Sequence, residues 1–166
     1  MYIEGMEEYK FRDSNGRELK PDEVVRQISS YIKDKPEYKY KIIIGTDSEG
    51  LNEGEADFVT AIVVHRIGNG GKYFWRRVKG AKFFTMRDRI INEVTISLDI
   101  AQNMLSVFKE GLGNLEWDFE IHADVGENGA TSILIQEVVG MIRANNFEPR
   151  TKPESYAASS VADRHC

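Results

Sequence analysis

The sequence predicts a single α/β domain built on a mixed, five-stranded sheet. Its 166 residues fit one domain of ordinary size. Three strand-like runs separated by turn signals precede the first long helical pattern of the main domain. Helical and strand patterns then alternate, giving the order β-β-β-α-β-α-β-α. Such an order favours a sheet with helices on both faces, over residues 41–166, after an N-terminal extension over 1–40 that contains one helix.

The composition excludes several classes of protein. With 41% hydrophobic and 30% charged residues, the chain can build a core, so wholesale disorder is excluded. The longest apolar stretch is too short for a membrane helix, and the acidic start lacks the features of a signal peptide. We therefore expect a cytoplasmic protein that does not bind membranes. The only cysteine is Cys166, so any metal would be held by oxygen or histidine ligands.

The first half of the chain combines one helix with three strands. Pro21 suits the first turn of a helix, apolar residues then recur at helical spacing, and Pro36 ends the pattern. Apolar and β-branched runs follow, and a glycine-rich turn at 68–71 favours a hairpin. The predicted strands cover residues 41–46, 57–66 and 72–78.

The second half alternates helices and strands. Thr85 and Asp88 have the spacing of a capping box, and the apolar stripe behind them predicts a helix over about 86–110. A strand is predicted over 118–124 and a helix over about 130–144. An extended segment between Pro149 and Pro153 suits only an edge strand, because proline cannot donate to a sheet. A short helix over about 155–165 is expected to close the fold.

Residues 72–89 form a basic segment within an acidic protein. The whole chain has a net charge of -5, whereas this segment carries seven basic residues against one acid, a local charge of +6. Aromatic residues interleave with the cations and could stack on bases. A half-buried strand, with its aromatics in the core and its cations in water, explains the pattern equally well. The candidate nucleic-acid-binding residues are Lys72, Arg76, Arg77, Lys79, Lys82, Arg87 and Arg89.

Four acids are candidates for a metal site. Asp47 and Asp124 follow two apolar runs, and if these strands are parallel neighbours, both carboxylates meet at one edge of the sheet. Neighbouring carboxylates repel, so a divalent cation would stabilise them. Glu93 lies beside the apolar stripe of its helix, and Asp163 lies among small residues in the last predicted helix. Each acid taken alone also suits a plain structural role, as a strand-end cap or an exposed helix residue.

Several segments resemble the YkuK family of ribonuclease H-like proteins. They are IIIGTDSEG, ADFVTAIVVHRIGNGGKYFWRRVKG, IHADVGENG and PESYAASSVADRH. The resemblance implies a ribonuclease H-like sheet of order 3-2-1-4-5 whose second strand is antiparallel. It also implies that Asp47, Glu93, Asp124 and Asp163 hold two Mg²⁺ or Mn²⁺ ions. A nuclease of this kind hydrolyses phosphodiester bonds of RNA, DNA or their hybrid by a two-metal mechanism.

Two alternatives stay open at this point. Glu49 follows Asp47 by two residues, so both point to one face of a continuing strand, as in an Asp-x-Glu pair of proofreading-type exonucleases. The histidine or tyrosine that such enzymes place shortly before their last aspartate is missing, which favours Glu93 over Glu49. The second alternative is a non-catalytic nucleic-acid-binding or scaffolding protein, which the acidic net charge favours. The sequence does not indicate the oligomeric state.

Overall fold

The computed structural model describes residues 9–52, 54–83, 85–129 and 131–155. One seven-stranded sheet contains the strands β1 (Phe11–Arg12), β2 (Glu18–Leu19), β3 (Tyr40–Asn52), β4 (Glu55–Arg66), β5 (Gly71–Lys82), β6 (Asp118–His122) and β7 (Glu148–Arg150). The helical elements are α1 (Pro21–Asp34), α2 (Met86–Leu112), the 3-10 helix η2 (Ser132–Leu134) and α3 (Ile135–Ala144). The strand order across the sheet is β2-β1-β5-β4-β3-β6-β7.

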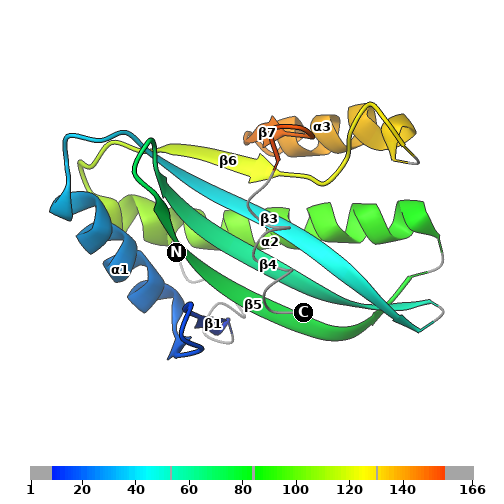
Figure 1. The fold of residues 1–166 in the computed structure, drawn as a ribbon, viewed down its shortest axis with the longest axis horizontal. Coiled ribbons are helices and arrows are strands. Elements are labelled where there is room, and N and C mark those ends of the chain that lie inside the picture. The colour runs from blue at the N-terminus through cyan, green and yellow to red at the C-terminus, as the bar shows by residue number, and fades with distance from the viewer. Residues whose placement is uncertain (1–8, 53, 84, 130, 156–166) are drawn as a thin grey trace.

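The main strands confirm the predicted topology. β3, β4 and β5 pair antiparallel, while β3, β6 and β7 pair parallel. Their order β5-β4-β3-β6-β7 is the predicted 3-2-1-4-5. Figure 1 shows the three long strands side by side, with α2 running behind them and α3 next to β7. The protein is thus a mixed α/β fold in which β3 is central and carries parallel strands on one side only.

The sheet has two strands more than the predicted five. Residues 11–19 form a small hairpin whose turn is stabilised by Asp13, since its Oδ1 accepts hydrogen bonds from the amides of Asn15 and Arg17, both at 2.9 Å. β1 extends the sheet by pairing with β5, where Arg12 lies opposite Trp75. Strands of two residues are too short to show the alternation from which sequence patterns are recognised.

The second half differs from the prediction mainly at element boundaries. The helix predicted over 130–144 is divided into η2 and α3, and the predicted edge strand at 149–153 pairs as β7 over Glu148–Arg150. The predicted helix over 155–165 lies almost wholly outside the described residues. The boundary between an N-terminal extension and a main domain stays a prediction, although α1 packs in the same core as α2.

The helices α1, α2 and α3 pack on one face of the sheet. They share a hydrophobic core with strand residues such as Ile42, Ile44 and Ile62. The opposite face carries a smaller cluster around Ala61, with Val63, Tyr73 and Trp75 packed against it. The helices within the described residues lie on one face, and the last predicted helix, over about 155–165, falls almost wholly outside them.

Helix α2 is fixed at both ends. At its start, Thr85 Oγ1 accepts a hydrogen bond from the Asp88 amide at 3.0 Å, as the capping-box prediction expects. Near its end, α1 approaches so closely that a Cβ on Gly111 would lie 2.3 Å from Val25 Cγ1. A side chain at position 111 would therefore force α1 and α2 apart or displace Val25, so glycine allows the two helices to pack closely here.

The long strands explain one wrong prediction. Asp47 was expected just after a strand that ends at Thr46, but it lies inside β3. The pairing of β3 with β6 ends at Gly45 opposite His122, whereas its pairing with β4 continues to Asn52 opposite Glu55. Asp47 therefore lies where β3 has lost its parallel neighbour, at an open edge of the sheet. Among the described helices, none has the length and apolar character needed to cross a membrane.

Candidate metal centre

Glu93 is a buried acid between helix α2 and strand β3. Its side chain is 5% exposed, on the same stripe of α2 as Ile90, Val94 and Ser97. The neighbouring contact is also polar: Ser97 Oγ lies 2.7 Å from Thr46 Oγ1, which lies 2.9 Å from Thr60 Oγ1. These hydroxyl groups make the interface between α2 and the strands polar beside Glu93. A buried carboxyl group needs hydrogen-bond partners of this kind.

Ser48 and Arg89 hold the Glu93 carboxylate. The Ser48 hydroxyl donates a short hydrogen bond to Glu93 Oε2. Arg89 donates from Nε to Ser48 Oγ at 2.6 Å and from Nη2 to the Ser48 carbonyl oxygen at 2.7 Å. The guanidinium therefore fixes the orientation of the serine, and the serine fixes the orientation of the glutamate.

Asp47 occupies the open edge of β3. Its Oδ1 accepts a hydrogen bond from the Ser48 amide at 2.9 Å. Ser48 points toward α2, and successive residues of a strand point to opposite faces. Asp47 thus leaves β3 on the face opposite to Ser48, in the stretch without β6 beside it. Glu49 shares that face, is exposed, and lies opposite Asp57 of β4.

Asp124 follows strand β6 by two residues. The chain around it is held to the segment that continues β7, because the Ala123 amide donates to the Arg150 carbonyl oxygen at 2.9 Å and the Lys152 amide to that of Val125 at 2.8 Å. The carboxylate forms an ion pair with Lys152, with 3.0 Å between Nζ and Oδ1. The side chain of Asp124 is 34% exposed, so it lies at the rim of the sheet.

The charges of Asp47 and Asp124 act on Glu93. Burial raises the pKa of Glu93 most, the hydrogen bond from Ser48 lowers it, both aspartates raise it and Arg89 lowers it, for a resulting pKa of about 8. At neutral pH the metal-free carboxyl group therefore keeps its proton. The three acids therefore interact electrostatically, and the charges of Asp47 and Asp124 add to the effect of burial on Glu93.

The three acids have the donor chemistry of a magnesium or manganese site but do not form a closed one. Mg²⁺ binds oxygen ligands and few protein carboxylates, which suits this set. Yet, of the residues whose placement is described, no three acidic, histidine or cysteine side chains lie close enough together to hold a metal ion. The fourth predicted ligand, Asp163, lies outside the described residues.

Comparison with known proteins identifies the family. A family model described as "Ribonuclease H-like" matches residues 23–166. The chain belongs to the ribonuclease H-like family. It is also 30% identical over 155 residues to the "Uncharacterized protein YkuK" of Bacillus subtilis (strain 168), a match that covers 86% of this chain and 88% of that protein. No solved structure gives a significant match.

The basic segment of this ribonuclease H-like chain is partly engaged inside the protein. Arg77 forms an ion pair with the buried Asp57 at 2.8 Å, and Arg87 forms one with Glu137 of α3. Arg89 binds Ser48, as described above. Among the other candidates, the Arg76 guanidinium lies over the Tyr9 ring at 5.0 Å, Lys72 is half-buried, and Lys79 and Lys82 are exposed.

Sequence reasoning did not identify Ser48, Lys152 or the role of Arg89. Ser48 stands next to Asp47, and the alternation of β3 would have placed it toward α2 had the strand been extended beyond Thr46. Arg89 lies four residues before Glu93, on the same side of the helix, which is the available signal for its role. Nothing in the sequence pairs Lys152 with Asp124, since their contact depends on the register of β6 and β7.

Proposed function

We propose that the protein is a divalent-metal-dependent nuclease that hydrolyses phosphodiester bonds of RNA, DNA or their hybrid. The observation that carries this proposal is the buried carboxyl group of Glu93, whose pKa is raised by burial and by the charges of Asp47 and Asp124. Ionised carboxylates that lie near one another repel, and a bound divalent cation would stabilise them. Membership of the ribonuclease H-like family, which is associated with nucleic acids, supports a role for such a cation in phosphodiester hydrolysis.

Asp47, Glu93, Asp124 and Asp163 are the proposed ligands of two Mg²⁺ or Mn²⁺ ions. When bound, such ions lower the pKa of an attacking water and stabilise the leaving oxygen at phosphorus. The protein contributes the orientation of its ligands. Ser48 and Arg89 hold Glu93 toward the edge of β3, and in the metal-free protein Lys152 pairs with Asp124 beyond the end of β6.

The exposed cations of the third long strand are proposed to bind the substrate backbone. Lys79 and Lys82 are exposed on the part of β5 that lies beside the open end of β3 and β4. Contacts of this kind supply affinity without sequence specificity. Arg77, Arg87 and Arg89 take part in internal contacts, so we expect them to contribute less than their positions in the sequence indicate.

A cleavage assay tests the proposal. The purified protein is incubated in Mn²⁺ with labelled single-stranded DNA, duplex DNA, RNA and RNA–DNA hybrid. We expect cleavage of at least one substrate, lost in Asp47→Asn and Asp124→Asn and retained in Asp118→Asn. Asp118 is a matched control because it is an exposed aspartate at the opposite end of β6. Cleavage that persists in Asp124→Asn would show a contaminating nuclease and contradict the proposal.

A non-catalytic nucleic-acid-binding protein is the second candidate. One observation favours it: within the described parts of the chain, no three potential ligands converge on a metal position. This candidate predicts that labelled nucleic acid binds the wild type and Asp124→Asn equally well, and that no substrate is cleaved in Mn²⁺. The same set of substrates and variants therefore separates the two functions.

A further inference from the structure

A cavity lies next to Asp124, on the side away from strand β3. It has a volume of about 580 Å³ and is bordered by the loop 126–128 after β6, by α3 and by the segment 149–154. Asp124 is not among the residues that line it. The size falls in the range of small-molecule sites, which is about 300–1,000 Å³. The cavity is therefore a separate space that adjoins the candidate metal centre.

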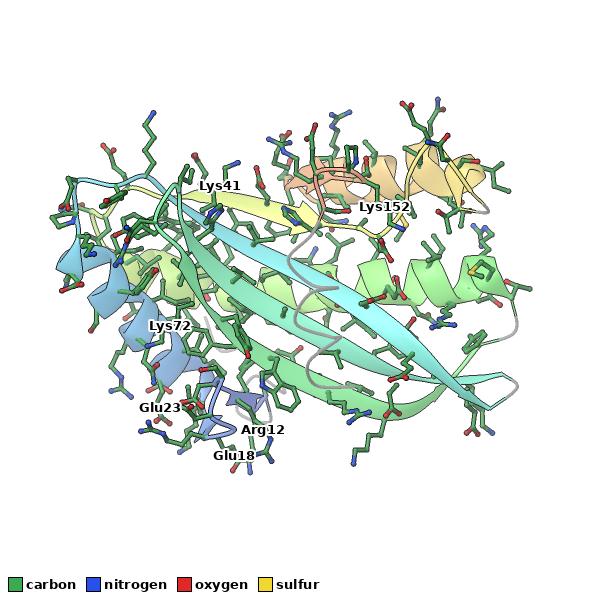
Figure 2. All side chains as sticks on the ribbon, in the orientation of Figure 1. Arg12, Glu18, Glu23, Lys41, Lys72 and Lys152 are labelled. Atoms are coloured by element: carbon green, nitrogen blue, oxygen red, sulfur yellow. The ribbon has the colours of Figure 1, made fainter. Side chains whose placement is uncertain are left out.

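Lys152 stands between the cavity and the metal centre. Its Nζ lies 3.0 Å from Asp124 Oδ1, and the residue also lines the cavity. Its backbone is fixed by the hydrogen bond to Val125, and a Cβ on Gly126 would lie 2.9 Å from Lys152 Cβ. Figure 2 shows Lys152 beside the chain that leaves β6, far along that strand from Lys41. Because the backbone of Lys152 is fixed and its side chain is long, its ammonium group can reach either Asp124 or the cavity.

The charges around the cavity favour an anion. Of the three cations that line it, Arg150 is engaged by Glu120 at 3.1 Å and by Glu148 at 2.6 Å. Arg143 lies in the last turn of α3, is exposed, and has no ion-pair partner in the described part of the chain. Of the two acids, Glu154 lies 3.7 Å from Arg150 and Glu127 is exposed. Arg143 is thus the lining cation without an ion pair among the described residues, and Lys152 is paired with Asp124, which does not line the cavity.

We propose that this cavity is an anion subsite that binds a phosphate group of the nucleic-acid strand beside the scissile bond, with Lys152 and Arg143 as its ligands. The inference rests on the proposed function. In the metal-free protein Lys152 pairs with Asp124. When Asp124 turns to a cation, the ammonium group becomes available to the phosphate, so loading of metal and binding of substrate are coupled through one side chain.

Binding without cleavage tests the subsite directly. We use the Asp124→Asn variant, which frees Lys152 and prevents hydrolysis, and measure its binding to a short fluorescein-labelled single-stranded DNA by anisotropy in EDTA. Adding Lys152→Gln or Arg143→Gln should each weaken binding about threefold to tenfold. The logarithm of the association constant falls as the logarithm of the salt concentration rises. Each substitution should make this slope less steep by about one, because one phosphate contact is lost.

A matched control and a competitor complete the experiment. Lys109→Gln removes an exposed cation in the last turn of α2, outside the cavity, and should leave affinity and salt slope unchanged. Inorganic phosphate at constant ionic strength should compete only at concentrations far above those of the DNA. If Lys152→Gln and Arg143→Gln bind DNA as their parent does, or change only the binding of inorganic phosphate, the subsite proposal is wrong.

The coupling has its own readout in the wild-type background. Lys152→Gln should lower the Mn²⁺ concentration that half-saturates thermal stabilisation, because the ammonium group no longer competes for Asp124, while Arg143→Gln should leave it unchanged. Equal half-saturation in all three proteins would contradict the coupling. These measurements do not depend on cleavage, so a failure of the subsite is distinguishable from a failure of the nuclease proposal.

Discussion

Two buried glutamates, Glu93 and Glu120, show opposite electrostatics at almost equal burial. Their exposed fractions are 5% and 4%. Burial alone would raise both pKa values, but hydrogen bonds from His122 and Lys41 and the charge of Arg150 lower the pKa of Glu120 overall. The pKa of Glu93 instead rises to about 8, because burial and the charges of Asp47 and Asp124 outweigh the hydrogen bond from Ser48 and the charge of Arg89. Burial is the largest cause at both acids, and the neighbouring groups decide whether it is outweighed, as at Glu120, or not, as at Glu93.

The difference separates a structural acid from a functional one. Glu120 lies between Lys41 at 3.2 Å and Arg150 at 3.1 Å, so it joins β3, β6 and β7 through internal ion pairs. At Glu93 the charge of Arg89 does not offset burial and the two aspartates, and groups with pKa values perturbed in this way cluster at functional sites. The comparison predicts that Glu120 contributes to stability and that Glu93 contributes to metal-dependent activity at a cost in stability.

The largest expected difference is in catalysis. Glu93→Gln should reduce metal-dependent cleavage about 10³-fold, because a removed metal ligand costs several kcal/mol of transition-state stabilisation. Glu120→Gln should leave the rate within about tenfold at a temperature where the variant is folded. Initial rates at saturating substrate measure both. Equal losses in the two variants would mean that the glutamates do not have separate roles.

The next largest difference is in stability. Glu120→Gln should lower the free energy of unfolding by about 2–3 kcal/mol, because Lys41 and Arg150 lose the carboxylate that both contact. Metal-free Glu93→Gln at pH 8 should be at least as stable as the wild type, since it removes the cost of ionising a buried acid. Urea unfolding in EDTA measures both values. A destabilised Glu93→Gln would show that this carboxylate is compensated after all.

The two acids should also respond oppositely to pH. The pKa of folded Glu93 lies above its ordinary value, so the folded state binds more protons between about pH 4.5 and 8, and metal-free stability falls as pH rises through that window. The slope from this group is at most about 1.4 kcal/mol per pH unit. Glu120, whose pKa is lowered, contributes stability above its ordinary pKa that is lost on acidification.

Unfolding at a series of pH values, compared between variants, isolates these contributions. The free energy of unfolding of the wild type should fall relative to that of Glu93→Gln as the pH rises from 5 to 8. The wild type should have a higher free energy of unfolding than Glu120→Gln, and this difference should become smaller as the solution is acidified. A pH-independent difference for Glu93→Gln would contradict the raised pKa.

The smallest expected effect is at Ser48. Ser48→Ala removes the donor to Glu93 and one acceptor of Arg89, which should cost about 1 kcal/mol of unfolding free energy and raise the pKa of Glu93 further. Thr95→Ala is a suitable control, because that hydroxyl donates to the Ile91 carbonyl oxygen on the exposed side of α2. A shift of the pH profile that is equal in both variants would argue against the positioning role of Ser48.

Much of the fold could be predicted because it depends on local patterns. The stripe behind Thr85 is long enough to define α2, and the glycine turn at 68–71 defines the hairpin of β4 and β5. The sheet order came from the resemblance to a family and is confirmed by the pairing of β3 with both β4 and β6. The hairpin of β1 and β2 was missed because two-residue strands carry no periodicity.

The candidate site could be predicted only in part. Asp47 and Asp124 were expected to approach each other because both follow apolar runs; the charges of both raise the pKa of Glu93, and their convergence on one metal site stays a prediction. The sequence did not predict which basic residue would pair with which acid. Whether an acid meets Lys152, or Lys41 and Arg150, depends on the register between β3, β6 and β7, which no local pattern in the sequence encodes.

The central claim is that Asp47, Glu93 and Asp124 bind a divalent cation. The most direct test is the melting temperature at pH 8 in millimolar Mn²⁺ compared with EDTA, for the wild type, Asp47→Asn and Glu120→Gln. We expect a rise of about 5 °C for the wild type and a similar rise for Glu120→Gln, because the metal binds only the folded state. Asp47→Asn should show none. An unchanged wild type, or an equal rise in Asp47→Asn, would contradict the account.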